Sequence, residues 1–155
     1  MKLYFKSPVL LLAAAACLFC SCASMDLYFK TRQIKPLAQE IVTEVTRGGE
    51  TSEGLESSSI PGVDALKQGM KERYVRFMPS YESGILTEGD NGYLRVEDVR
   101  RMGMMERRKF AKQVHVENDA RKELYKLIAQ HVGLRSSYEE EVAGEFAEQW
   151  QAVGK

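Results

Sequence analysis

The amino-acid sequence predicts a small all-α domain of about four helices, with at most one short β-hairpin. Apolar residues recur at helical spacing in four separate segments between residues 34 and 153. One tight-turn signal, Asn91-Gly92, has apolar residues on both sides and is the place for a hairpin. The chain contains no internal repeat that would indicate a solenoid.

The first apolar stripe predicts a helix over residues 35–47. Its members are Ile34, Leu37, Ala38, Ile41, Val42 and Val45. Pro36 is tolerated in a first helical turn, and Gly48-Gly49 favours a stop. Residues 48–62, GGETSEGLESSSIPG, are polar and rich in glycine and serine. We interpret them as a flexible linker between an anchoring segment, residues 22–47, and a helical domain, residues 63–155.

A second stripe begins at Val63, and Pro79 interrupts its polar side, so we expect a kink or a break near Met78. The members of this stripe are Val63, Leu66, Met70, Tyr74, Phe77, Tyr81 and Ile85. Ile85-Leu86 and Tyr93-Leu94 then flank the turn as a short hairpin. Because an isolated hairpin is marginally stable in water, this one must lie against the helices.

Two further helices are predicted, one from about Met104 to His131 and one after Gly133. The stripe of the third helix contains Phe110, Val114, Ala120, Leu124, Leu127, Ile128 and Val132. The stripe of the fourth contains Tyr138, Val142, Phe146, Trp150 and Val153, and glutamates occupy most of its remaining surface.

Charged residues interrupt the third stripe. At about 100° per residue, Glu117 and Arg121 fall in its middle, spaced i,i+4 in the order that favours a salt bridge. One interpretation is a structural pair that joins this helix to its neighbour and specifies packing. The other is a recognition pocket, in which Arg121 and Asn118 bind a polar group. No nucleophile or metal-binding set accompanies the pair, so we predict no catalytic residues, no cofactor and no metal.

All three cysteines lie between Cys17 and Cys22, in the stretch CLFCSC. They lie in or just after an apolar run of eleven residues, 9–19, which follows two lysines and is well short of the ~20 residues that span a bilayer. This is the plan of a secretory signal peptide. FCSC resembles a bacterial lipobox, which predicts a signal peptide over residues 1–21 and diacylglycerol on Cys22. Cleavage after Ala23, giving a freely secreted protein, is the alternative.

Two acyl chains would hold the mature protein on a membrane surface without a transmembrane helix. Ala23 stands where an aspartate would act as the inner-membrane retention signal, by resemblance to known sorting rules. The sequence therefore favours the periplasmic face of an outer membrane. The formal net charge of zero falls to about −2 when the two leader lysines are removed. The mature chain therefore lacks the excess of basic residues that is typical of nucleic-acid-binding proteins.

A basic patch precedes and begins the third helix. It consists of Arg100, Arg101, Arg107, Arg108, Lys109 and Lys112. One interpretation is a solvated face that pairs with the acidic last helix. The alternative is contact with anionic lipid headgroups or with an acidic partner.

Three segments together resemble the YdbL-like family of bacterial envelope proteins, a domain of unknown function. They are TEGDNGYLRV, VENDARKELYKLIAQHVG and VAGEFAEQW, and the resemblance covers about residues 63–150. The residues that match are Glu88, Gly92, Tyr93, Asn118, Arg121, Tyr125 and Ala129. The resemblance implies an envelope location, association with AsmA-like proteins that bridge two membranes, and small partner lipoproteins. It brings no reaction with it.

These inferences lead to a non-enzymatic, lipid-anchored helical module that binds or regulates another envelope component. The candidate partner-binding residues are Glu88, Gly92, Tyr93, Glu117, Asn118, Arg121 and Tyr125. Two alternatives remain open at this point. One is a direct lipid or cell-wall binder, and the other is an envelope hydrolase with Glu88 or Glu117 as its general acid.

Overall fold

The structure, a computed structural model, describes residues 32–47 and 56–153. The predicted signal peptide and the predicted lipid attachment at Cys22 lie outside the described residues. The elements in order are a helix over residues 32–47, η1 (Glu56–Ser59), α2 (Val63–Glu82), β1 (Leu86–Glu88), β2 (Leu94–Val96), α3 (Met104–His131), η2 (Ser136–Tyr138) and α4 (Glu139–Val153). The prediction of an all-α domain with one short hairpin is confirmed.

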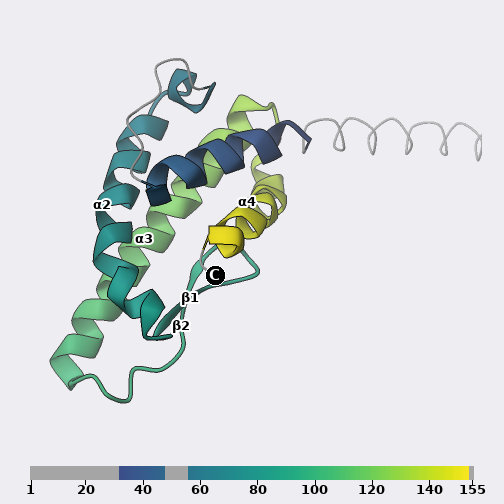
Figure 1. The fold of residues 1–155 in the computed structure, drawn as a ribbon. Helices are drawn as coiled ribbons and strands as arrows, with labels where there is room; N and C mark the ends of the chain where they lie inside the picture. Colours follow the sequence, from purple (N-terminus) through teal and green to yellow (C-terminus); the bar gives the residue numbers. More distant parts are fainter. Residues whose placement is uncertain (1–31, 48–55, 154–155) are drawn as a thin grey trace, which may run out of the picture.

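The longest of these helices, α3, forms the centre of the domain. It packs against α2 and α4, and the helix over residues 32–47 crosses it (Figure 1). The six apolar residues predicted for the first stripe are all 0–2% exposed, and they belong to one core together with side chains of α2, α3 and α4. The helix over residues 32–47 is therefore part of the packed domain.

The predicted flexible linker at residues 48–62 needs correction. Residues 48–55 lie outside the described residues, but the second half of the segment is folded. It contains η1, and both Ser57 and Ile60 are buried. The expected boundary therefore does not separate an anchoring arm from a helical domain.

Polar contacts explain why a serine-rich segment packs here. The backbone N–H of Ser57 donates to Glu40 Oε1 at 2.9 Å. Lys67 Nζ, on α2, donates to Glu44 Oε2 at 2.8 Å and to Ser57 Oγ at 3.0 Å. Hydrogen bonds thus connect η1 with α2 and with the helix over residues 32–47. They give the buried hydroxyl of Ser57 a partner, so its burial does not cost the free energy of an unsatisfied polar group.

We expected a kink or a break in α2 near Met78. The break is wrong, because the helix continues through Pro79 to Glu82, and the kink stays a prediction. Pro79 is exposed and lies in the last turn, so the helix loses only the one hydrogen bond that an N–H at residue 79 would make to the carbonyl oxygen of Val75. Its own carbonyl oxygen still accepts a hydrogen bond from the N–H of Ser83 at 3.2 Å.

The hairpin is antiparallel, with Leu86 opposite Val96 and Glu88 opposite Leu94. Leu86 and Leu94 are buried in a second, smaller core with Phe77 of α2 and Phe110 and Val114 of α3. The prediction that the hairpin lies against the helices is confirmed. Within the described ranges, no helix combines the length and the apolar character needed to cross a bilayer.

Candidate functional site

The charged residues that interrupt the third stripe meet the hairpin inside the domain. Arg121 is 1% exposed and donates to both carboxylate oxygens of Glu88, from Nη1 at 2.6 Å and from Nη2 at 2.9 Å. Its Nε donates to Glu117 Oε1 at 3.2 Å, so the predicted i,i+4 pair is confirmed. A planar guanidinium favours such forked contacts, which fix orientation as well as charge.

Helix α2 supplies the remaining partners of the two carboxylates. Arg73 Nε donates to Glu117 Oε2 at 2.6 Å. The hydroxyl of Tyr81 donates to Glu88 Oε1 at 2.5 Å. Two buried carboxylates therefore face two arginines, and the cluster is balanced in charge, as burial requires.

One carbonyl oxygen in the turn of the hairpin accepts hydrogen bonds from α3, and one of these donors is itself hydrogen-bonded to α4. The carbonyl of Gly92 accepts hydrogen bonds from Arg121 Nη1 at 3.1 Å and from the hydroxyl of Tyr125 at 2.6 Å. Trp150 Nε1, on α4, donates to that hydroxyl at 3.1 Å, and Arg121 Cζ lies 4.0 Å from the centroid of the Trp150 ring. The guanidinium is thus also in cation–π geometry.

Gly92 is required at this point of the turn. Its φ is +80°, and a Cβ there would lie 2.5 Å from the carbonyl oxygen of Ala143 on α4. A side chain would be strained and would push the hairpin away from α4. We name the set Arg73, Tyr81, Glu88, Gly92, Glu117, Arg121, Tyr125 and Trp150 the Arg121 network.

Asn118 fixes the neighbouring strand. Its Oδ1 accepts a hydrogen bond from the N–H of Leu94 at 2.8 Å, and its Nδ2 donates to the carbonyl oxygen of Leu94 at 3.1 Å. The side-chain amide of Asn118 therefore makes hydrogen bonds with both backbone polar groups of Leu94 at the edge of β2, as a neighbouring strand would.

Burial determines the protonation of the groups in this network. Burial first, and then the charge of Glu88, raises the pKa of Tyr81 far above its usual value. Burial likewise raises the pKa of Tyr125. Burial alone would lower the pKa of Arg121, but the charge and hydrogen bonds of Glu88 outweigh it and the pKa is raised. Both phenols therefore act as neutral hydrogen-bond donors, and Arg121 stays charged.

This geometry corrects the predicted partner-binding patch. Glu117, Arg121 and Tyr125 are at most 3% exposed, and Gly92 is buried. Within the described ranges no buried side-chain polar atom lacks a hydrogen-bond partner. A side chain without exposed surface or unused hydrogen-bonding capacity cannot select a partner, so these residues hold the fold together. The contacts of Glu117 and Arg121 fit the other interpretation, a structural pair that joins α3 to its neighbours.

The other predicted partner-binding residues also have little free surface or hydrogen-bonding capacity. The side chain of Glu88 is 4% exposed, and that of Asn118 is committed to Leu94. Tyr93 is half-buried, with its ring 5.5 Å from that of Tyr125. A hydrolase would need a carboxylate open to a cleft. Glu88 and Glu117 do not meet that requirement, because arginines cover both of them.

Sequence reasoning missed Arg73, Tyr81 and Trp150 as members of the network. One signal was available for Arg73, because a carboxylate in the middle of an apolar stripe, such as that of Glu117, needs compensating cations when it is buried. Nothing local in the sequence says that this cation comes from α2, 44 positions earlier.

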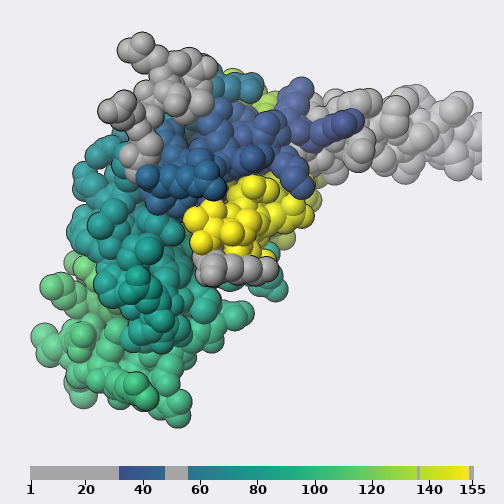
Figure 2. All heavy atoms as spheres, in the orientation of Figure 1, coloured from purple at the N-terminus to yellow at the C-terminus, as the bar shows by residue number. Residues whose placement is uncertain are grey.

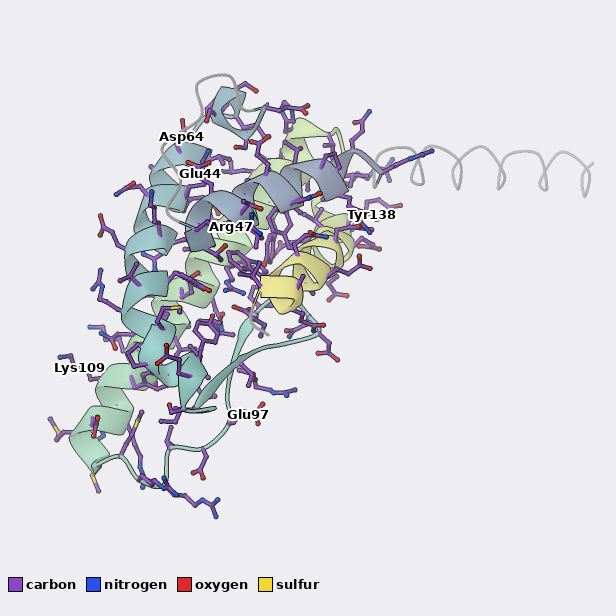
Figure 3. All side chains as sticks on the ribbon, viewed as in Figure 1. Glu44, Arg47, Asp64, Glu97, Lys109 and Tyr138 are labelled. Carbon is purple, nitrogen blue, oxygen red and sulfur yellow. The ribbon has the colours of Figure 1, made fainter. Side chains whose placement is uncertain are left out.

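The basic patch lies at the opposite end of α3 from α4. Figure 3 shows Lys109 pointing away from the molecule there, whereas Tyr138, next to α4, lies on the other side. The predicted pairing of the patch with α4 is wrong for the described residues, in which Glu148 of α4 pairs with Lys35 at 3.1 Å.

Two of the six cations in the patch have partners. Arg100 pairs with Asp98 at 2.8 Å and lowers the pKa of that carboxyl to about 2. Arg107 donates to the carbonyl oxygens of Met102 and Arg100, both at 2.9 Å. The other four are exposed and make no hydrogen bond or ion pair with any described residue; they are Arg101, Arg108, Lys109 and Lys112.

A groove of about 280 Å³ between α2 and α3 adjoins the patch. Phe77 and Val116 supply apolar walls, and Arg76 and Lys112 supply cations. The groove and the patch share Lys112, so together they form one surface of mixed apolar and cationic character.

Comparisons of this chain with protein-family models, with curated proteins and with solved structures give no match. The resemblance to the YdbL-like family stays a prediction. Four of the residues that carry it belong to the Arg121 network; they are Glu88, Gly92, Arg121 and Tyr125.

Proposed function

We propose that this protein is a non-enzymatic lipoprotein, anchored by Cys22, that binds or regulates another component of the cell envelope. The lipobox-like sequence supports the anchor, and the resemblance to the YdbL-like family supports the location. That resemblance also points to an AsmA-like intermembrane lipid-transport protein as the partner. The periplasmic face of the outer membrane is the proposed site of action.

One observation carries the binding role, and it is the distribution of unpaired charge. The buried charged groups of the Arg121 network all have partners, whereas four exposed cations, one just before α3 and three in its first half, have none among the described residues. Surface charges that are left without partners add nothing to the stability of the fold and are available to another molecule.

The position of the first helix defines the proposed tether. Because the packed domain already includes the helix that starts by residue 32, about ten residues would connect it to Cys22. Ten extended residues reach at most about 35 Å. The domain would therefore stay close to the membrane that holds its lipid, instead of reaching out on the linker at residues 48–62.

Crosslinking in intact cells, followed by identification of the captured protein, tests this proposal. The wild type is compared with Cys22→Ala and with the matched control Cys20→Ala, which changes a leader cysteine that carries no lipid in the proposal. We expect one envelope protein to be captured by the wild type and by Cys20→Ala, and the capture to be lost with Cys22→Ala.

Mass analysis of the native protein completes the test. Diacylglycerol on residue 22 and loss of residues 1–21 are expected. An unacylated residue 22 with the leader still attached would refute the anchor, and normal capture by Cys22→Ala would refute its role.

A further inference from the structure

We infer that the first half of α3 docks on a bilayer of anionic phospholipid. The docking surface consists of Met104, Met105, Arg108, Lys109, Lys112 and Val116. This inference rests on the proposed function and extends it, because it names a lipid surface on which the anchored domain would lie in addition to its protein partner.

Basic residues outnumber acidic ones on this surface, where Glu106 is the one carboxylate among residues 104–116. Arg108, Lys109 and Lys112 are exposed and unpaired among the described residues, and Arg101 adds a fourth such cation just before the helix. Each basic residue close to an anionic membrane surface contributes about 1 kcal/mol of binding. The field of the patch therefore favours a densely anionic surface over a neutral one.

Exposed apolar side chains lie among these cations. Met104 and Met105 are 71% and 76% exposed, and Val116 is 44% exposed. Met105, Lys109, Lys112 and Val116 follow the spacing i, i+4, i+7 and i+11, so they share one side of the helix. A helix surface that combines cations with exposed apolar side chains suits the boundary between headgroups and acyl chains.

The second half of α3 provides an internal comparison. Its outward residues carry charge of both signs, with Lys126 Nζ 3.3 Å from Glu123 Oε2. The lack of carboxylates between Arg107 and Val116 is thus a local property and does not extend along the helix.

The shape favours a membrane over a folded acidic partner. The start of α3 lies at one extremity of the molecule (Figure 2), and Met104 and Met105 belong to its first turn. A fluid lipid surface adapts to such an end, whereas a protein partner needs a matching concave surface. The groove at Phe77 and Lys112 adds an apolar wall beside a cation, which suits the glycerol region and phosphate of a lipid.

Vesicle partitioning tests the inference, with the mature chain from residue 22 carrying Cys22→Ala so that no acyl chain contributes. The vesicles are phosphatidylcholine alone, and phosphatidylcholine mixed with phosphatidylglycerol. The wild-type domain should bind the mixed vesicles and release them as salt is raised. The triple variant Arg108→Gln, Lys109→Gln, Lys112→Gln should bind them roughly a hundredfold more weakly at low salt.

The matched control makes the same change of charge elsewhere, with Lys122→Gln, Lys126→Gln and Arg135→Gln, all at exposed positions. It should lose little of the affinity. The double variant Met104→Ser, Met105→Ser should weaken binding while the preference for anionic vesicles remains.

Equal losses in the two triple variants would overturn the inference, because net charge alone would then explain binding. Absence of binding to mixed vesicles would also overturn it. If a protein partner is still captured in cells through the same basic residues, the proposed function stands with an acidic protein as the component bound. If capture fails as well, both are refuted.

Discussion

Charged residues are buried and paired in the middle of α3, whereas they are exposed and mostly unpaired at its beginning. In the middle, Glu117 and Arg121 are buried and every buried side-chain polar atom of the Arg121 network has a partner. At the beginning, three successive basic residues and Lys112 face solvent with few internal contacts. The comparison teaches that the charged residues most conspicuous in the sequence, those inside an apolar stripe, hold the fold together. The less conspicuous basic patch is the surface that we propose for binding.

Loss of Arg121 should have the largest effect. Arg121→Ala leaves Glu88 without its cation and Glu117 with Arg73 alone. Removing one partner of a buried pair typically costs about 3–5 kcal/mol, so urea denaturation should show the free energy of unfolding reduced by that amount. The exposed control Arg135→Ala should change it by less than about 0.5 kcal/mol. A loss below about 1 kcal/mol for Arg121→Ala would contradict the structural role.

Gly92→Ala should be the next most damaging change. Its cost combines a left-handed backbone with a Cβ placed against the Ala143 carbonyl, for a total of about 2–4 kcal/mol. Gly84→Ala is the matched control, since its φ is +69° but no atom lies within 4 Å of the added Cβ. Thermal unfolding of both variants separates the two contributions. Equal destabilisation would mean that contact with α4 does not matter.

Alkaline pH should weaken the network through its phenols. The pKa values of Tyr81 and Tyr125 are raised in the folded state, so the unfolded chain loses these protons first. Stability should therefore be unaffected below about pH 9 and fall above about pH 10, by about 1.4 kcal/mol per pH unit for each phenol. Urea midpoints measured from pH 8 to pH 11 check this, and Tyr81→Phe should reduce the slope. An unchanged slope would show that Tyr81 does not contribute.

Asn118→Leu should produce the smallest of these effects, about 1–2 kcal/mol, because it leaves the N–H and the carbonyl of Leu94 to water. Hydrogen exchange at the Leu94 amide should become faster, while exchange in the core of α3 follows only the global loss. Asn91→Ala removes a longer, exposed hydrogen bond to the Tyr93 amide and should have less effect on Leu94. Unchanged exchange at Leu94 would rule out the strand-like role of Asn118.

Local patterns predicted much of the fold. The bounds of α3 were predicted as Met104 to His131 because its stripe is long and regular, and they are confirmed. The pair Glu117 and Arg121 was predicted because i,i+4 neighbours on a helix meet whatever surrounds them. The hairpin followed from Asn91-Gly92 in the same way.

The rest depends on contacts that local patterns do not encode. Arg121 meets Glu88 across 33 positions, and Trp150 meets Tyr125 only because α4 packs on α3. The composition of residues 48–62 indicated a flexible segment. Composition does not show that the Ser57 N–H would donate a hydrogen bond to Glu40, which helps to hold this segment on the domain. The predicted recognition patch failed for the same reason, because the sequence placed its residues together without saying that they face inward.

Site-specific photocrosslinking in cells tests the central contrast most directly. A photoreactive aromatic residue is placed at Lys112, in the basic patch, and separately at Tyr93, beside the Arg121 network. The account predicts adducts with an envelope component, lipid or protein, from position 112 and none from position 93. Adducts from position 93 alone would contradict it, and would restore the hairpin and its buried network as the binding site.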